Sequence, residues 1–250
     1  MKHAIFYSGQ ARTFSNCFYN QHWQVLRHLE DPEFFICVAD DAQAPSMELL
    51  YKRFPKDKVH INIVKQPEFP ESDFLEDKNL HSAYPRSSKM LSVLRAFWFY
   101  QEVWKMGSKR CFDEGATVVR IRPDLWFMDF SLPGNLISPY DCYTVPWGSF
   151  GGINDRFAVM GHVAADGYFN TLSFFQKLAD MGCPLHPETM TKASVELVGG
   201  GCKQTLLADY RTRRLPDPNH AEKNNHDKEW YQFDPIGAYE MVKASLSNRQ

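Results

Sequence analysis

VVRIRPDLWF, residues 118–127, joins a strand-like run to a charged turn. Valine and isoleucine alternate with Arg120 and Arg122, a pattern typical of a β-strand that carries both arginines on one face. Pro123 has no backbone N–H and therefore ends such a strand. The strand predicted over residues 116–122 would thus bring two arginines, and Asp124 directly after them, to the point where the chain leaves a sheet.

The chain before this strand predicts a β-α-β-α-β order. Apolar runs at Ala4–Ser8, Phe34–Val38 and Val59–Val64 indicate buried strands. A helix with apolar residues at helical spacing follows the first run and stops at Pro32, and a short helix fits SMELLYKRF, residues 46–54. Strands that alternate with helices over short connections form a parallel sheet flanked by helices. We therefore expect a Rossmann-like arrangement of strands and helices in the first half of the chain.

Later segments extend the α/β pattern. The acidic, proline-bearing segment Lys65–Arg86 is typical of a long functional or mobile loop. Further elements are expected in chain order: a helix ending at Gly107, strands in CYTVPW (142–147) and DRFAVMG (155–161), a helix over 163–178, a helix opening at Pro187, a flexible break at VGGGC (198–202) and a terminal helix from Asp234. No repeat or linker divides the chain, so we predict one α/β domain over residues 1–250.

Composition excludes several classes of protein. The net charge of −2 lacks the cationic excess that nucleic-acid binding needs. No apolar run reaches the ~18 residues of a membrane-spanning helix, and the start of the chain is too polar for a signal peptide. The six cysteines contain no C-x-x-C pair, which favours reduced thiols over a disulfide framework or a zinc cage. We expect a soluble, cytoplasmic protein, in the host cytoplasm if its source is viral.

Polar residues gather where the predicted strands end. SGQAR follows the first strand, Asp40 and Asp41 follow the second, RPD follows the fourth, and GGIND (151–155) precedes a later strand. Ligands of open parallel sheets lie beyond the carboxyl ends of the strands. Small residues there allow close backbone approach, and arginines can fork onto phosphate oxygens. These residues indicate an anionic, nucleotide-like ligand whose charge is held partly by a metal ion.

Four of these motifs, in this order, resemble those of GT-A-type glycosyltransferases of bacterial and viral polysaccharide and glycan synthesis: SGQARTF, RIRPDLWF, GGINDRFAVMG and HPE. The resemblance spans Lys2 to Leu197, and the pair R-x-R-P-D and N-D-R-F is its most specific part. It implies a GT-A-like domain with a nucleotide-sugar-binding half (1–124) and an acceptor-binding half (125–250). The implied activity moves a sugar from a nucleoside-diphosphate sugar to a glycan hydroxyl.

The resemblance also implies a divalent metal, Mn²⁺ or Mg²⁺. GT-A enzymes hold this ion with an Asp-x-Asp motif, and the ion neutralises the leaving diphosphate. Asp124 occupies the corresponding place and is the candidate metal ligand, while Arg122 stands where the first aspartate would be. Either other residues, such as His220 or His226, complete the site, or the arginines take over part of the role of the ion.

Other residues receive candidate roles toward the donor, each beside a structural alternative. Ser8 and Gly9 allow backbone approach. Tyr7 either stacks on the base or belongs to the core, and Arg12 either reaches the diphosphate or is solvated. Asp40 or Asp41 contacts the nucleoside, and whichever of them does not do so caps a helix or forms a turn. Arg120 and Arg122 contact phosphate or pair with buried carboxylates.

On the acceptor side, Glu188 resembles the acidic base of inverting enzymes or merely complements a helix dipole. Asp155 is its rival, and Trp147 is the candidate for stacking on an acceptor sugar. Gly152 and the adjacent Gly151 let backbone approach a sugar or shape a turn. A catalytically inactive sugar- or nucleotide-binding module of the same fold is the main alternative function, which the missing first aspartate favours. A nucleotidyltransferase is disfavoured because its glycine-rich, lysine-bearing loop is absent. The sequence fixes neither the stereochemistry nor the oligomeric state.

Overall fold

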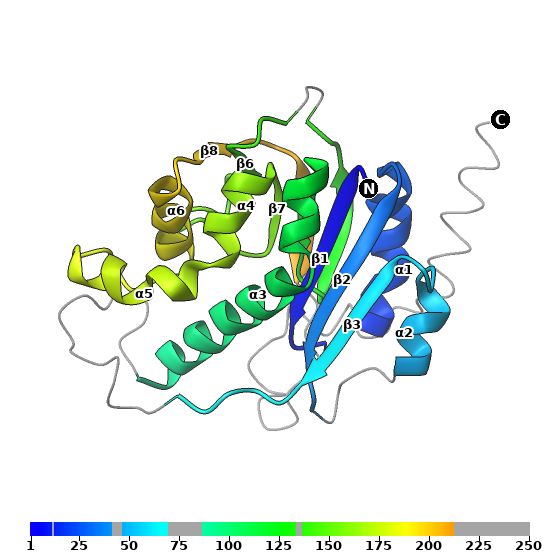
Figure 1. The fold of residues 1–250 in the computed structure, drawn as a ribbon, viewed down its shortest axis with the longest axis horizontal. Helices are drawn as coiled ribbons and strands as arrows, with labels where there is room; N and C mark the ends of the chain where they lie inside the picture. The colour runs from blue at the N-terminus through cyan, green and yellow to red at the C-terminus, as the bar shows by residue number, and fades with distance from the viewer. Residues whose placement is uncertain (12, 42–46, 70–86, 134–136, 213–250) are drawn as a thin grey trace, which may run out of the picture.

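The computed structural model describes residues 1–11, 13–41, 47–69, 87–133 and 137–212 (Figure 1). Arg12, His220, His226 and the terminal helix predicted from Asp234 lie outside the described residues, as does most of the predicted loop Lys65–Arg86. No helix within the described ranges is long and apolar enough to cross a membrane.

Seven strands form one mixed, mostly parallel sheet, which confirms the predicted α/β class. The spatial order is β3-β2-β1-β4-β7-β6-β8. Only β7 runs against its neighbours β4 and β6, and the remaining pairs are parallel. The bounds are β1 His3–Gly9, β2 Pro32–Ala39, β3 Val59–Val64, β4 Thr117–Ile121, β6 Asp141–Thr144, β7 Phe157–Met160 and β8 Gly201–Gln204. The first four strands lie where the sequence predicts them.

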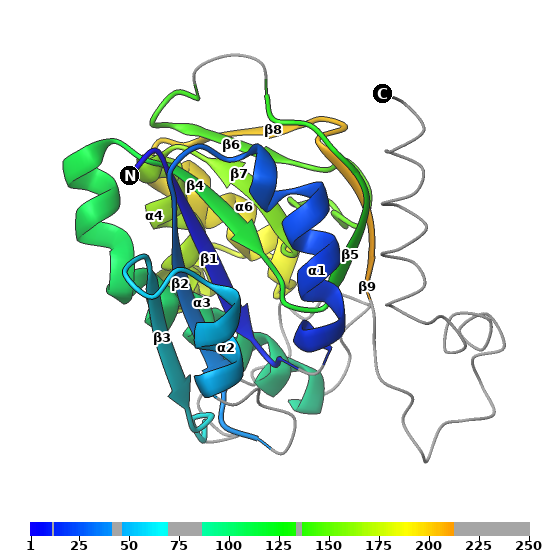
Figure 2. The same cartoon turned by 90° about the vertical axis from the view of Figure 1, so that its right-hand side faces the viewer.

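A second, two-stranded antiparallel sheet was not predicted. It pairs β5 (Leu125–Phe130) with β9 (Ala208–Thr212), and it lies beside α1 (Figure 2). The sequence of β5 follows Pro123 directly, so it reads as the exit from β4 and not as a strand of its own. Its partner β9 is distant in the chain, which is why the local pattern did not reveal the pair.

Helices cover both faces of the large sheet (Figures 1 and 2). One face packs against α3 (Ser87–Glu114), α4 (His162–Phe169), α5 (Thr171–Asp180) and α6 (Pro187–Leu197), and the other against α1 (Phe14–Gln24), the 3-10 turn η1 (Leu26–His28) and α2 (Met47–Arg53). Strand β1 shows the alternation, because Phe6 joins the core beneath α3 whereas Tyr7 joins the core beneath α1.

Two predicted helix boundaries were wrong. The helix expected to end at Gly107 continues to Glu114, because this glycine lies inside the helix against Phe35 of β2. A Cβ at Gly107 would come within 2.7 Å of the Phe35 ring, so the missing side chain permits close packing. The helix expected over residues 163–178 is divided into α4 and α5 at Asn170, whose backbone conformation leaves the helical region.

Candidate anion-binding site

A cavity of about 430 Å³ lies at the carboxyl ends of β1 and β4. Its lining combines the end of β1, one side of α3, the charged turn after β4 and the loop before β7: Ser8, Gly9, Gln10, Gln66, Ser92, Arg95, Ala96, Phe99, Tyr100, Arg120, Arg122, Asp124 and Asp155. The parallel pairing of β1 with β4 places Phe6 opposite Arg120, so the two polar strand ends meet at one edge of the sheet. This is the position that open α/β sheets use for ligands.

Arg120 is buried in the wall of this cavity and has no ion-pair partner among the described residues. Its side chain is 1% exposed, and one terminal nitrogen, Nη2, donates to the Ser8 carbonyl at 3.3 Å. The guanidinium carbon lies 4.9 Å from the centre of the Tyr100 ring. Among the described residues, Nε and Nη1 have no hydrogen-bond partner, and no carboxylate forms an ion pair with Arg120. The alternative that this arginine pairs with a buried carboxylate is therefore not what the structure shows.

Arg122 differs from Arg120 because it has a carboxylate partner. Its Nε and Nη2 donate to the two oxygens of Asp124 at 2.6 and 3.1 Å, and Nη2 also donates to Thr212 Oγ1 at 3.2 Å. Burial alone would lower the pKa of the Arg122 guanidinium, but the charge of Asp124 outweighs burial and raises it. Arg122 is thus a permanent cation held in a fixed orientation at the cavity wall.

The residues around Asp124 do not fit a divalent metal. Both carboxylate oxygens of Asp124 accept hydrogen bonds from Arg122, and the part of the chain that the structure describes contains no group of three histidine, cysteine, aspartate or glutamate side chains that could hold an ion. Hard cations such as Mg²⁺ and Mn²⁺ need several free oxygen ligands. In the described structure the partner of Asp124 is a guanidinium, and its role as a metal ligand stays a prediction.

Asp155 reaches the same cavity from the loop before β7. Its backbone carbonyl accepts a hydrogen bond from the Tyr100 hydroxyl at 2.9 Å, which fixes the loop against α3. Its carboxyl oxygen Oδ1 is buried, lies 3.8 Å from Arg156 Nε and accepts no hydrogen bond within the described structure. Next to it, Asn154 is fully buried and its Oδ1 accepts from Tyr210 at 2.6 Å. The N-D-R-F motif therefore combines a structural asparagine with an aspartate that faces the cavity.

Glu188 contacts this loop through its backbone but does not line the cavity. It lies in the first turn of α6, directly after Pro187. Its side chain is buried, and its Oε2 lies 2.7 Å from His186 Nδ1. Burial, followed by the negative charge of Asp155, raises the pKa of Glu188 to about 8. The charges of Arg156 and Arg122 partly oppose this rise, so Glu188 lies near the arginines although, unlike Asp155, it does not line the cavity.

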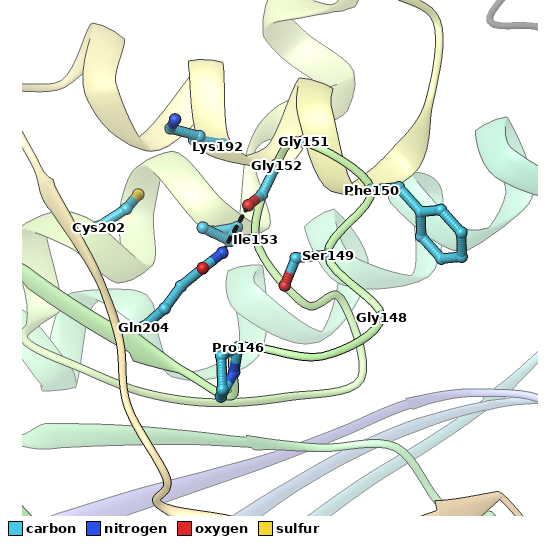
Figure 3. Close-up of a pocket in the computed structure, with 10 residues that line it drawn as sticks. All are labelled: Pro146, Gly148, Ser149, Phe150, Gly151, Gly152, Ile153, Lys192, Cys202 and Gln204. Carbon is cyan, nitrogen blue, oxygen red and sulfur yellow. Dashed lines mark hydrogen bonds between the residues drawn. The ribbon is translucent and has the colours of Figure 1, made fainter.

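Gly152 belongs to a second cavity, of about 640 Å³, shown in Figure 3. Gln204 of β8 donates to the Gly152 carbonyl at 2.9 Å, and the Ile153 amide donates to the Glu188 carbonyl at 3.0 Å. A Cβ at Gly152 would overlap the backbone of Glu188. The glycine is thus needed for contact with α6, a reason that the sequence did not reveal, and its approach to a sugar stays a prediction.

The remaining predicted residues separate into two groups. Ser8 and Gly9 line the first cavity. Tyr7 does not: it is fully buried with its ring against Phe14 and Phe54, which leaves no face for a nucleobase and corrects the stacking prediction. Asp40 is exposed at the end of β2 and is not part of the cavity lining.

The sequence did not single out the contribution of α3. Arg95 and Tyr100 project into the cavity from this helix, and Arg95 Nε is buried without a hydrogen-bond partner. The only available signal was an arginine within the apolar run MLSVLRAFWFY, residues 90–100. Trp147 packs against Tyr210 at 4.3 Å between ring centres, is only partly exposed, and its carbonyl accepts a hydrogen bond from the Asn154 side chain.

No protein-family model and no curated protein sequence matches the chain. Among solved structures it is similar to the galactosyltransferase LgtC in complex with donor and acceptor sugar analogues. That similarity has a TM-score of 0.40 and 9% sequence identity, and it covers 80% of this chain and 72% of the other. At that distance it transfers neither an activity nor a ligand.

Proposed function

We propose that this protein is a glycosyltransferase that takes its sugar from a nucleoside-diphosphate sugar and transfers it to a glycan hydroxyl. The observation that carries the proposal is the buried Arg120 in the wall of a cavity at the carboxyl ends of β1 and β4. Its Nε and Nη1 find no partner in the part of the chain that the structure describes. The motif resemblance to GT-A-type enzymes supplies the choice of a nucleotide sugar among anionic ligands.

The physical reasoning starts from the cost of burying a charge. An ionised group without a partner is expensive in a protein interior, and folding keeps it only where something offsets the cost. A phosphate group would do so, since guanidinium N–H groups form strong, geometrically matched hydrogen bonds with phosphate oxygens. In glycosyl transfer the diphosphate leaves with growing negative charge, which donors fixed in advance stabilise.

Asp155 is the acidic residue that we assign to the sugar side of the reaction. Its Oδ1 is buried at the cavity without a hydrogen-bond donor. A carboxylate in this condition can accept a hydrogen bond from a sugar hydroxyl, either to orient the donor or to remove a proton from the acceptor. Glu188, whose backbone carbonyl accepts a hydrogen bond from the Ile153 amide, would position this loop.

The experiment is a binding and hydrolysis screen. Thermal unfolding is measured with UDP, GDP, CDP and dTDP, and nucleotide release is then measured from sugar donors of the base that binds. A ligand at ~100 times its Kd stabilises the folded state by about 2.7 kcal/mol. Arg120→Gln should abolish the shift, whereas Arg110→Gln, at a half-exposed arginine of α3, should preserve it. No shift with any nucleotide, together with no donor hydrolysis, would refute the proposal.

A catalytically inactive binding module of the same fold is the second candidate. The pairing of Asp124 with Arg122 and the burial of Glu188 favour it, because both remove acidic groups from solvent. A module of this kind would bind the nucleotide sugar through Arg120 but release no nucleotide. A donor that raises the unfolding temperature and stays intact with glycan acceptors present would therefore select this candidate.

A further inference from the structure

The cavity presents more positive than negative groups to a ligand. Of the residues that the structure describes, three arginines line it, Arg95, Arg120 and Arg122, against two carboxylates, Asp124 and Asp155. One of these carboxylates is already paired, because Asp124 accepts two hydrogen bonds from Arg122. The free hydrogen-bonding capacity is therefore mainly that of N–H donors, which suits an anion and not a cation.

The three arginines also approach from two different elements. Arg120 and Arg122 are two residues apart, so their Cα atoms are separated by about 6.6 Å along the strand and their side chains share a face. Arg95 comes from α3, which packs across β1 and β2 on that same side of the sheet. A ligand with two linked phosphates can thus meet guanidinium groups from both walls.

We infer that this site binds the diphosphate of its donor without a divalent cation, with the arginines in its place and with Asp124 as the internal counter-ion of Arg122. This inference rests on the proposed function. In the free protein Asp124 holds Arg122 in position. When phosphate oxygens arrive, they compete with Asp124 for the same N–H groups, so this carboxylate opposes binding and does not assist it.

If Asp124 is a counter-ion, Asp124→Asn should change the affinity for the diphosphate in the opposite direction from that expected if Asp124 is a metal ligand. A metal ligand replaced by its amide would lose the ion and with it the diphosphate. A counter-ion replaced by its amide leaves the ligand phosphates as the remaining negative partner of Arg122, so binding is kept or becomes tighter. The sign of the change in Kd therefore separates the two roles.

The test is isothermal titration calorimetry with inorganic pyrophosphate and with the four nucleoside diphosphates, in EDTA and in Mn²⁺. We expect a nucleoside diphosphate and pyrophosphate to bind in EDTA, with Asp124→Asn binding at least as tightly as the wild type. Arg122→Gln and Arg95→Gln should each weaken binding by about tenfold or more, the size of a lost charge-assisted hydrogen bond. Asp113→Asn, which removes an exposed carboxylate of α3, controls for the change in net charge.

The outcomes distinguish this inference from the proposed function. Binding that requires Mn²⁺ and is lost in Asp124→Asn would overturn the inference and leave the proposed function standing. Pyrophosphate binding in EDTA without any nucleotide binding would support the arginine site and overturn the proposed function. No binding under either condition would overturn both. Circular dichroism of each variant establishes that it is folded, and Arg95→Gln, at a partly exposed position, remains informative if Arg122→Gln does not fold.

Discussion

Replacing Glu188 by glutamine should stabilise the protein near pH 8 and have little effect near pH 5. Burial and the nearby charge of Asp155 raise the pKa of Glu188 from 4.5 to about 8 in the folded state. A carboxyl group of this kind takes up a proton on folding at any pH between those two values, so stability falls as the pH rises through this window. The difference of about 3.5 pH units, at about 1.4 kcal/mol each, sets a ceiling of about 5 kcal/mol.

The expected gain is smaller than this ceiling because His186 offsets part of the cost. Its Nδ1 lies 2.7 Å from Glu188 Oε2, close enough to share a proton with the carboxyl group. We expect Glu188→Gln to gain about 2 kcal/mol near pH 8, which corresponds to about 4–8 °C in Tm for a chain of this size. Urea unfolding between pH 5 and pH 8 measures the difference, and Glu196→Gln, at a half-exposed position on the same helix, is the control.

A loss of stability in Glu188→Gln at every pH would contradict this reasoning. It would mean that the carboxylate is ionised and paired with a protonated His186, since breaking a buried ion pair is destabilising. An equal gain at every pH would also contradict it, because the gain must fade as the pH approaches the ordinary pKa of a glutamate.

Three further predictions concern other parts of the molecule. Gly152→Ala should lower the unfolding free energy by about 1–3 kcal/mol, measured by urea unfolding, because the added Cβ would overlap the backbone of α6. The control Gly201→Ala, whose added Cβ would enter open space, should leave the urea midpoint nearly unchanged. Cys202 should react with iodoacetamide faster than its strand neighbour Cys142, because a hydrogen bond with the Cys142 thiol lowers the pKa of Cys202. Cys142→Ala should slow the labelling of Cys202. Mass spectrometry of the labelled peptides measures both rates, and equal rates for the two thiols would contradict this prediction. Arg120→Met should maintain or raise the Tm, since it removes a buried charge that has no ion-pair partner in the described residues. The same variant should abolish pyrophosphate binding. A Tm lowered by several degrees would instead show that the arginine stabilises the free protein.

The convergence of charged groups at one sheet edge could be predicted from the sequence. The order of strands and helices required β1 and β4 to be parallel, and parallel strands end at the same edge. That reasoning placed Ser8, Gly9, Arg120 of β4 and Arg122 just after β4 near one another with no knowledge of tertiary contacts. Their individual partners could not be predicted, since Arg122 had the same local signal whether it met phosphate or Asp124.

The wrong predictions arise where the local sequence does not distinguish the two faces of a strand, or where the deciding contacts are with residues far away in the chain. In the run AIFYS every residue is apolar or small, so the pattern did not reveal that Tyr7 faces the core beneath α1 and not the cavity. Glu188 and Gly152 are far apart in sequence, and only the folded structure shows that each requires the other in its place. Arg95 belongs to a helix, and which side of a helix meets a sheet edge depends on packing that the chain does not encode locally.

The antiparallel pairing of β4 with β7 brings the motifs R-x-R-P-D and N-D-R-F together. Arg120 lies opposite Ala158, and the Arg122 amide donates to the Arg156 carbonyl at 3.0 Å, so R-x-R-P-D and N-D-R-F are the two sides of one backbone ladder. Substitutions at Arg122 and Asp155 should consequently be non-additive, as expected for residues in one network. We therefore expect related chains to differ more in the length of the segment between the motifs than within the motifs, and a change in one motif to accompany a change in the other.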